Sequence, residues 1–514
     1  MPLRPFNRQQ TWLLPPTLDE LIADDHPVRF IASLVDSLED NVWQQMGVDL
    51  NGGSLGTPAY HPRALLGVWL YGFMTGTRSS RKLESACRDQ MPYLWLTGWQ
   101  HPDHNTLWRF YKEHRTKMHH LFKLTVRTAV NMDLVDMAIQ AIDGTKIQAN
   151  AARDRTYDTK ALQALFKRVD TVIQELEKQN EEGEYSSPVH LSERLRRAQL
   201  LRTEIKAALE RLAEDDGLKR VNLTDSDAEL VKSRQGIVAG YNVQTVVSPL
   251  QLKGNGEPGG MFITAVAAVQ DADDHHQLVN MVEQAEEITG RRADITVADA
   301  GYHSGVNLAA CVERNQRVAI PESQENRLKP AHHDKFCYDA GTDSYTCSIG
   351  KTLKFIETRS VVKKTVRVYG GLGSVCHFCT AFGVCTTNRY RGRELLIGLF
   401  ETLLLKHKTW MATDEAKIAY RRRKQLSEPS FGIIKEQMGF RRFLLRGLHN
   451  VKAEAVIIAT AFNLRTLYRV WCWRWNTISK ALFSVVYTSV SKLFLLFIGC
   501  DSEEMSAVNV MVTY

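Results

Sequence analysis

The sequence predicts a protein of mixed class, α+β/α/β, with a helical N-terminal domain followed by a domain built on a central sheet. Two observations predict this class. Apolar residues recur at helical spacing from residue 17 to about residue 130, and β-rich runs then alternate with helical runs. A chain of 514 residues is long enough for about two to four domains. Its hydrophobic fraction of 44% and its net charge of +7 are those of a globular protein with a mild basic excess.

The first predicted domain, residues 17–130, ends with a basic helix. Asp103 or Asn105 can cap this helix, which carries Arg109 and Lys112. A short turn followed by a capped basic helix is typical of a helix-turn-helix that enters a DNA groove. The same residues also fit a surface helix with ordinary charges, so this pattern alone leaves both interpretations open.

The second predicted domain, residues 131–470, contains the sheet. Its expected strands are Val135–Ile142, Gly240–Ser248, Met261–Val269, Asp294–Ala298 and Arg317–Pro321, with helices at Asp273–Gly290 and Val306–Asn315. A helical-hairpin insert at 155–220 follows the first strand, and an irregular Cys-rich insert at 322–392 follows the last. Without the inserts, three antiparallel strands precede βαβ units, which is the order of a ribonuclease-H-like core.

Three acidic residues stand at strategic points of this order. Asp143 follows the first strand and Asp299 the fourth, and these strands are neighbours in such a sheet, so the two carboxylates should meet. Glu428 begins a late helix that fits over the same edge. Carboxylates packed together resist ionising unless cations neutralise them, and Mg²⁺ or Mn²⁺ prefers such oxygen ligands. The sequence therefore predicts a catalytic metal site for in-line phosphoryl displacement. Asp274 is most simply explained as a helix cap, and it is the alternative metal ligand if one of the three acids is misassigned.

The surroundings of Glu428 are the most basic part of the chain. Lys435 follows it by seven residues, two helical turns, so one side chain can hold a metal ion while the other holds a phosphate. An excess of one sign of charge favours a polyanion partner. The residues expected to contact DNA around the acids are Tyr302, Lys435, Arg441, Arg442 and Arg446.

Four of the nine cysteines are clustered. An odd number of cysteines in so long a chain argues against a secreted disulfide framework. One pair has the Cys-x2-Cys spacing of structural Zn²⁺ sites, whereas the last interval, Cys-x5-Cys, is looser. Two hypotheses stay open, a four-thiolate zinc site and a set of reduced, unligated cysteines, with His377 and Cys337 as alternative ligands. The four are Cys347, Cys376, Cys379 and Cys385.

The chain ends give no sign of a membrane protein. The N-terminus has no apolar run of signal-peptide length, so we expect a cytoplasmic protein. The stretch from Ala481 to Cys500 is apolar, but Lys492 and neighbouring polar residues interrupt it. We expect a packed or poorly ordered terminal segment there and no membrane partner. The C-terminal tail, residues 471–514, has no predicted role.

Several motifs resemble the DDE transposases of bacterial insertion sequences, in the group with an InsH-type helical N-terminal domain. They are IDGTKIQANA, YNVQ, VADAGYHS and EPSFGIIKEQMGFRRFLLRGLHNVKAE. The last is the most specific, since Glu428 and Lys435 match the Glu-x6-Lys of that family. The resemblance covers roughly Leu18 to Leu467 and implies a ribonuclease-H-like core with Asp143, Asp299 and Glu428 as metal ligands.

The resemblance also implies an activity and its partners. It implies binding of the element's terminal inverted repeats, nicking at the element ends, and attack of a 3′-hydroxyl on target DNA, by a homodimer on DNA. A related signature has Tyr seven residues and Arg four residues before the Glu. In this sequence those two positions hold Arg421 and Lys424, whereas Tyr420 and Arg423 each stand one residue earlier. The roles of that Tyr and that Arg are therefore not transferred. The alternatives are a metal-dependent nuclease on the same fold and a catalytically inert DNA-binding relic.

Overall fold

The computed structural model describes the backbone of residues 17–51, 58–182, 188–215, 217–233, 236–251, 259–271, 273–322, 336–339, 341–361 and 364–498. The chain divides into two compact units. The first comprises Met1–Leu121, Leu250–Gly260 and Thr460–Tyr514, and the second comprises Phe122–Pro249 and Met261–Ala459. In the part of the chain so described, no helix is long and apolar enough to cross a membrane.

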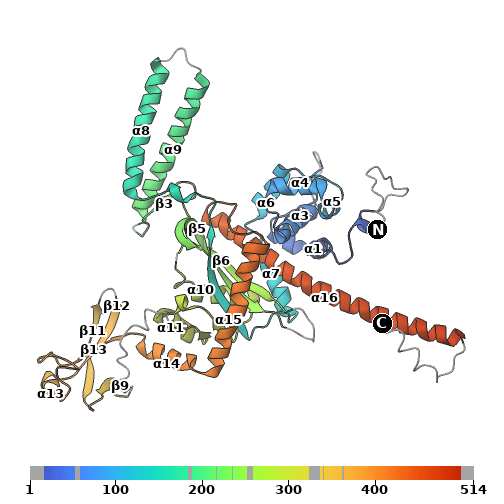
Figure 1. Cartoon of the computed structure of the whole chain (residues 1–514). Coiled ribbons are helices and arrows are strands. Elements are labelled where there is room, and N and C mark those ends of the chain that lie inside the picture. The colour runs from blue at the N-terminus through green and yellow to red at the C-terminus, as the bar shows by residue number, and fades with distance from the viewer. Residues whose placement is uncertain are drawn as a thin grey trace, which may run out of the picture. The chain divides into compact units, whose positions relative to one another are not determined.

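The first unit is a cluster of short helices around α3 (Figure 1). Residues Leu65–Met74 of α3 are all buried. The Trp69 indole N–H donates to the Leu107 carbonyl at 3.0 Å, and its ring stacks on Tyr111 with centroids 4.4 Å apart. The helices are α1 (Pro27–Asp36), α2 (Asp40–Gln45), α3 (Pro62–Thr75), α4 (Ser80–Asp89), α5 (Met91–Leu96) and α6 (His104–His114).

Helix α6 has one buried and one basic exposed face. Of the two predicted caps, Asp103 is the one used, because its carboxylate accepts a 2.7 Å hydrogen bond from the Thr106 N–H. Arg109 and Lys112 are exposed. The residues that face the core are Leu107, Phe110, Tyr111 and His114.

The second unit is built on a six-stranded sheet. Strand β5 pairs antiparallel with β1, β4 and β6, whereas β1 pairs parallel with β7, and β7 parallel with β8. The order β6–β5–β1–β7–β8 is therefore three antiparallel strands followed by parallel ones, as the sequence predicts. The strands are β1 (Ile139–Gln148), β4 (Glu229–Ser233), β5 (Gly236–Pro249), β6 (Met261–Val269), β7 (Ile295–Val297) and β8 (Arg317–Ala319).

Helices connect the parallel strands and cover the sheet. Helix α10 (Leu278–Thr289) precedes β7, and α11 (Gly305–Glu313) lies between β7 and β8. Helix α15 (Asp414–Gly432) packs its Ala419 and Leu426 against sheet residues from β1, β7 and β8. It continues into one π-helical turn, η5 (Ile433–Gln437). Further helices are α7 (His119–Asn131), α14 (Glu401–Met411) and α16 (Leu448–Ile498). The end of the predicted tail, 499–514, lies outside the described residues.

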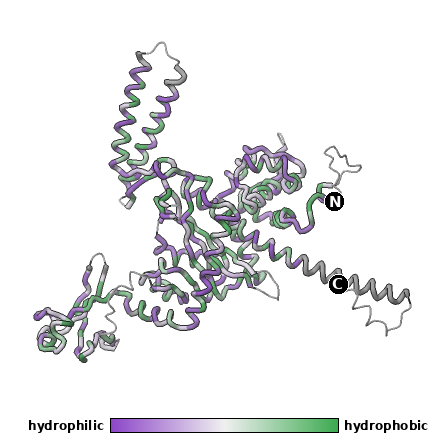
Figure 2. The backbone as a smooth tube through the Cα atoms, in the orientation of Figure 1, coloured by the Kyte–Doolittle hydropathy of each residue, from purple (hydrophilic) through white to green (hydrophobic). Residues whose placement is uncertain are grey.

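Two segments interrupt this core. Helices α8 (Thr159–Glu182) and α9 (Pro188–Glu214) form an antiparallel hairpin whose apolar seam includes Leu162, Ile173 and Ile205. Hydrophobic and hydrophilic residues alternate along both helices in Figure 2, because only the shared seam is buried.

The second segment differs from its prediction. The region expected to be irregular, 322–392, contributes β9 to β12 to a five-stranded antiparallel sheet in the order β13–β12–β11–β10–β9, and it contains helix α13 (Gly373–His377). Its short strands mix charged and apolar residues, as in TLKFIETRSV of β11, and so lack the clean alternation that reveals a strand. The strands are β9 (Phe336–Asp339), β10 (Ser344–Cys347), β11 (Thr352–Val361), β12 (Lys364–Gly370) and β13 (Glu394–Gly398).

Candidate active site

The first two acids both lie just beyond the point where the pairing of β1 with β7 ends. Ala141 of β1 pairs with Val297 of β7 in parallel register. Asp143 and Asp299 each come two residues after these partners; Asp143 is still in β1, whereas Asp299 lies just past the end of β7 in extended backbone. The prediction that the first strand ends before Asp143 is wrong: Asp143 lies within β1, opposite Thr245 of β5.

Asp143 is a largely buried carboxylate. Its Oδ1 accepts a 2.9 Å hydrogen bond from the Gly144 N–H. Burial raises the pKa of Asp143 above its ordinary value; a Ser427 hydrogen bond and the Arg423 charge oppose this rise, and the Asp299 charge adds to it. The two carboxylates are therefore close enough to repel each other.

Asp299 caps the short helix that follows β7. Its Oδ1 accepts a 2.8 Å hydrogen bond from the Gly301 N–H at the start of η3 (Ala300–Tyr302). This contact fixes the carboxylate beside the end of β7. Capping and metal binding are compatible, because a carboxylate has more acceptor positions than this one hydrogen bond uses.

Arg423 joins the first acid to the third. Its guanidinium lies 3.2 Å from an Asp143 oxygen and 3.7 Å from a Glu428 oxygen, and the Arg423 side chain is only 13% exposed. Both Arg423 and Glu428 belong to α15, whose apolar face packs on the sheet. A single cation thus contacts acids from two different elements.

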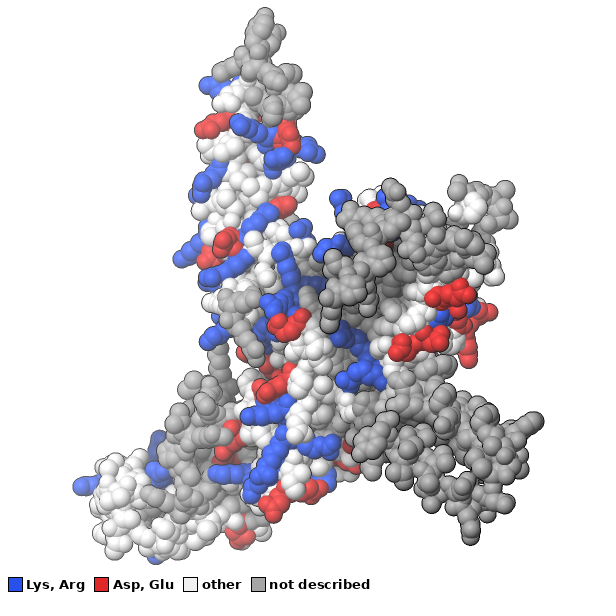
Figure 3. Space-filling model, turned by 45° about the vertical axis from the view of Figure 1, so that its right-hand side comes forward, with Lys and Arg blue, Asp and Glu red and all other residues white. Residues whose placement is uncertain are grey.

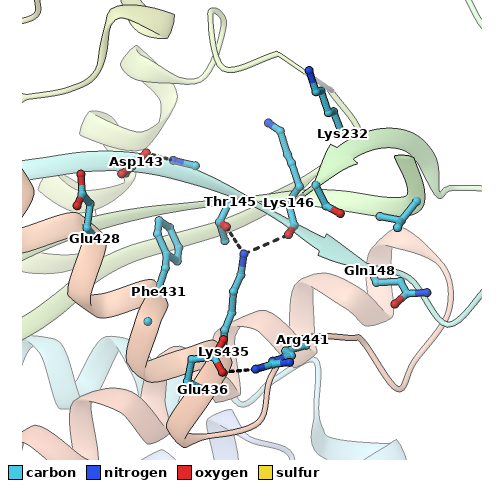
Figure 4. A pocket seen from close by; sticks show the side chains of 14 residues that line it. Asp143, Thr145, Lys146, Gln148, Lys232, Glu428, Phe431, Lys435, Glu436 and Arg441 are labelled. Atoms are coloured by element: carbon cyan, nitrogen blue, oxygen red, sulfur yellow. Dashed lines mark hydrogen bonds and ion pairs between the residues drawn. The ribbon is translucent and has the colours of Figure 1, made fainter. Parts of the chain in front are cut away.

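Glu428 and Lys435 line one cavity of about 460 Å³ with Asp143, as Figure 4 shows. The Lys435 ammonium donates to the Thr145 hydroxyl at 2.5 Å and to the Lys146 carbonyl at 3.3 Å, both on β1. The π-helical turn shifts Lys435 relative to ideal helical spacing, and such turns occur often at functional sites. Asp299 is not among the residues that line this cavity.

A buried polar network lies behind the acids. Asp274 accepts hydrogen bonds from Asn242 at 2.7 Å and Gln244 at 2.6 Å, and forms an ion pair with Lys146 at 3.2 Å. Gln244 in turn accepts a hydrogen bond from the Tyr302 hydroxyl. Tyr302 is fully buried, and this burial, with the Asp274, Asp143 and Asp299 charges, raises its pKa. Its ring is therefore not on a surface where it would stack on DNA.

The arginines after η5 are partly engaged with the protein itself. Arg441 pairs with Glu436. Arg442 donates to the Ala149 carbonyl at 3.2 Å and to the Asn150 side chain at 2.9 Å, and Arg446 donates to the Asn150 carbonyl at 3.0 Å. These contacts tie the segment to the end of β1, while the three side chains remain on exposed residues.

The donor set fits hard cations, although it is not gathered into a finished site. Within the described residues, no three His, Cys, Asp or Glu side chains lie together as metal ligands. The carboxylates of Asp143 and Asp299 nevertheless influence each other electrostatically, and Arg423 supplies positive charge between Asp143 and Glu428. An ion bound by these carboxylates would find oxygen donors, which Mg²⁺ and Mn²⁺ prefer.

Sequence reasoning missed the part played by Arg423 and by the network of Asn242, Gln244 and Asp274. The sequence held a signal for Arg423, because this residue stands one position before the Arg of the related signature. Asn242 and Gln244 lie in the YNVQ motif, and their alternation along β5 places both side chains on one face.

Two comparisons with protein families match opposite ends of the chain. Residues 16–113 match the family described as Transposase domain (DUF772), and residues 346–468 match the Transposase DDE domain. Neither the curated proteins nor the solved structures give a significant match. A DDE domain implies a ribonuclease-H-like core, and the order β6–β5–β1–β7–β8 agrees with it. Both matched domains are transposase domains, and together they are consistent with a DDE transposase of an insertion sequence.

Proposed function

We propose that this transposase binds the ends of its element, cleaves DNA there and joins the freed 3′-ends to target DNA. The observation that carries the proposal is that Asp143 and Asp299 lie just beyond the β1–β7 pairing and influence each other electrostatically, with Glu428 linked to Asp143 through Arg423. We infer that these three acids hold Mg²⁺ or Mn²⁺. When bound, two such ions activate the attacking oxygen and stabilise the leaving one.

The cations around the cavity suit a phosphate backbone. The cavity is lined by Lys146, Lys232, Lys435 and Arg441, against the acids Asp143, Glu428 and Glu436. The Lys435 ammonium is held by β1, so it presents a fixed positive charge near the acids. We infer that these side chains orient the scissile phosphate, and that Arg442 and Arg446 follow the strand away from the site.

The α8–α9 hairpin is a weaker candidate for DNA contact. On the face drawn in Figure 3, its Lys and Arg side chains are interspersed with Asp and Glu. Several of these charges pair with each other, as Arg202 does with Asp170 at 2.6 Å and Arg197 with Glu193 at 2.5 Å. We therefore assign DNA binding to the first unit and to the surroundings of Glu428, with a homodimer on DNA.

Incubation of the protein with Mg²⁺ and linear DNA that carries the element's ends tests the function. We expect 3′-end nicks and joined products, both lost when a chelator removes the metal. Nicks without joining would instead support a metal-dependent nuclease, and binding without either product would support an inert DNA-binding relic.

Arg109 and Lys112 test the role of helix α6. Because both are exposed on the face opposite the core, we expect Arg109→Ala and Lys112→Ala each to weaken binding of element ends while leaving the fold intact. If each cation neutralises a phosphate, the slope of log K against log salt falls by about 1 per substitution. Titrations at several salt concentrations measure this, with Glu113→Gln, also exposed on α6, as the control. An unchanged slope would exclude these two side chains from the DNA contact.

A further inference from the structure

The clustered cysteines line one cavity. It has a volume of about 890 Å³ and lies beside the five-stranded sheet. Cys347 stands at the end of β10, Cys376 in α13, and Cys379 and Cys385 in the turns that lead to β13. We propose that these four thiolates bind a structural Zn²⁺ ion. This proposal does not depend on the proposed function.

The segment Gly371–Arg393, which carries three of the four cysteines, has almost no apolar core. Only Gly373 and Gly392 within it are buried. Its large apolar side chains point outward, with Phe378 85% and Val384 91% exposed. The core of this region belongs to the strands, where Cys347 and Cys385 pack against its edge.

A segment without a core needs another source of order. Small folded regions with little apolar burial are usually held by disulfides or by a structural metal. The four cysteines are free, so disulfides do not supply this order. Four thiolates from three elements around one cavity are the ligand set of a structural zinc site.

The backbone forms tight turns at Cys347 and at the Cys-x2-Cys pair. The Lys351 N–H donates to the Cys347 sulfur at 3.3 Å, in a tight turn closed by the Cys347 N–H and the Lys351 carbonyl. In the Cys-x2-Cys pair, the Cys379 N–H donates to the Cys376 carbonyl at 3.2 Å, which turns the chain back on itself.

Two glycines make room for one of the thiols. The Cys376 sulfur lies 3.1 Å from where a Cβ on Gly371 would be and 3.0 Å from where one on Gly392 would be. Gly392 also has φ +68°, a conformation that other residues rarely adopt. The Cys376 thiol is thus fitted closely between two backbone segments, on the wall of the cavity.

The charges at the cavity suit a four-thiolate zinc centre, which carries net negative charge. Lys351 and Arg393 both line the cavity and offset that charge. The thiols stand on the cavity wall and do not yet meet at a point, since no such group of ligands is present in the described part of the chain.

Metal analysis of the full-length protein tests the site. After dialysis against excess Mg²⁺, which displaces ions from oxygen ligands, we expect about one zinc ion per chain. The variant with all four cysteines changed to Ser should lose it, and Cys337→Ser, an exposed cysteine on β9, should keep it. Absence of zinc from the parent, or unchanged zinc content in the four-fold variant, would overturn the proposal.

Thiol labelling of the unchanged protein removes the question of whether a variant folds. With zinc bound, maleimide should label Cys337 and spare the four cavity cysteines; after a chelator, all five should react. Mass mapping reads out each site. Equal labelling of the four with and without zinc, or their recovery as disulfides, would contradict the assignment.

Discussion

Asp143→Asn is expected to slow DNA cleavage about 10³-fold or more while leaving the binding of element ends unchanged. Asn keeps the size of the side chain and its place in β1 but removes the negative charge that we propose binds the metal. Loss of several kcal/mol of charge stabilisation at the metal centre corresponds to a rate loss of this order. Single-turnover cleavage and a binding titration on the same DNA separate the two effects.

Although Asp143→Asn should slow cleavage, we expect it not to destabilise the fold in the absence of metal. The pKa of Asp143 is raised in the folded protein, chiefly by burial. The favourable contribution of its protonated form is complete below the unfolded pKa and is lost as the pH rises through the folded pKa. At neutral pH the buried charge is therefore unfavourable, and Asp143→Asn in a chelator should melt at or above the temperature of the parent.

Added Mg²⁺ should then stabilise the parent more than the Asn variant, because only the parent keeps all three acids. Asp133→Asn is the matched control. Asp133 is an exposed carboxylate that pairs with Arg291, and its φ of +51° is one that Asn tolerates. The control should match the parent in both assays, and retention of cleavage by Asp143→Asn would show that the acids are misassigned.

The sheet could be predicted from the sequence because its strands carry strong local signals. The runs that become β5 and β6 are rich in β-branched and small apolar residues, and the strand before Asp299 is short but consists of β-branched residues alone. The end of the first strand was misplaced for a physical reason. IDGTKIQ is half-polar because it faces the site, so its pairing with β5 is set by tertiary contacts.

The interior of the site was less predictable, because its contacts are between residues distant in sequence. Tyr302 follows Asp299 closely, yet its ring is buried, and its hydroxyl donates a hydrogen bond to Gln244, 58 residues away in the sequence. The Arg423 contact with Asp143 spans 280 residues. Neither local pattern nor spacing specifies such pairs, and only the packing of α15 on the sheet brings Arg423 and Asp143 together.

Arg423→Gln is expected to move the acidic limb of the cleavage–pH profile to higher pH. The Arg423 charge lowers the pKa of Asp143 against the effects of burial and of Asp299. Gln removes that charge, so Asp143 keeps its proton up to a higher pH. The protonated carboxyl group binds metal less well. A shift of about one pKa unit lowers cleavage roughly tenfold on the acidic limb and leaves the alkaline plateau less affected.

Cleavage rates across pH at sub-saturating Mg²⁺ measure this shift, because proton and metal then compete for Asp143. Arg423→Lys keeps one positive charge beside Asp143 but not the fork that reaches two carboxylates, so its limb should move less. Arg422→Gln is the adjacent control, since Arg422 is 43% exposed and only 4.0 Å from Asp136, away from the three acids. An equal loss of cleavage rate at every pH would show that Arg423 only supports the fold. An acidic limb that Arg423→Gln shifts and Arg423→Lys largely restores would show that the charge of Arg423 sets the protonation of Asp143.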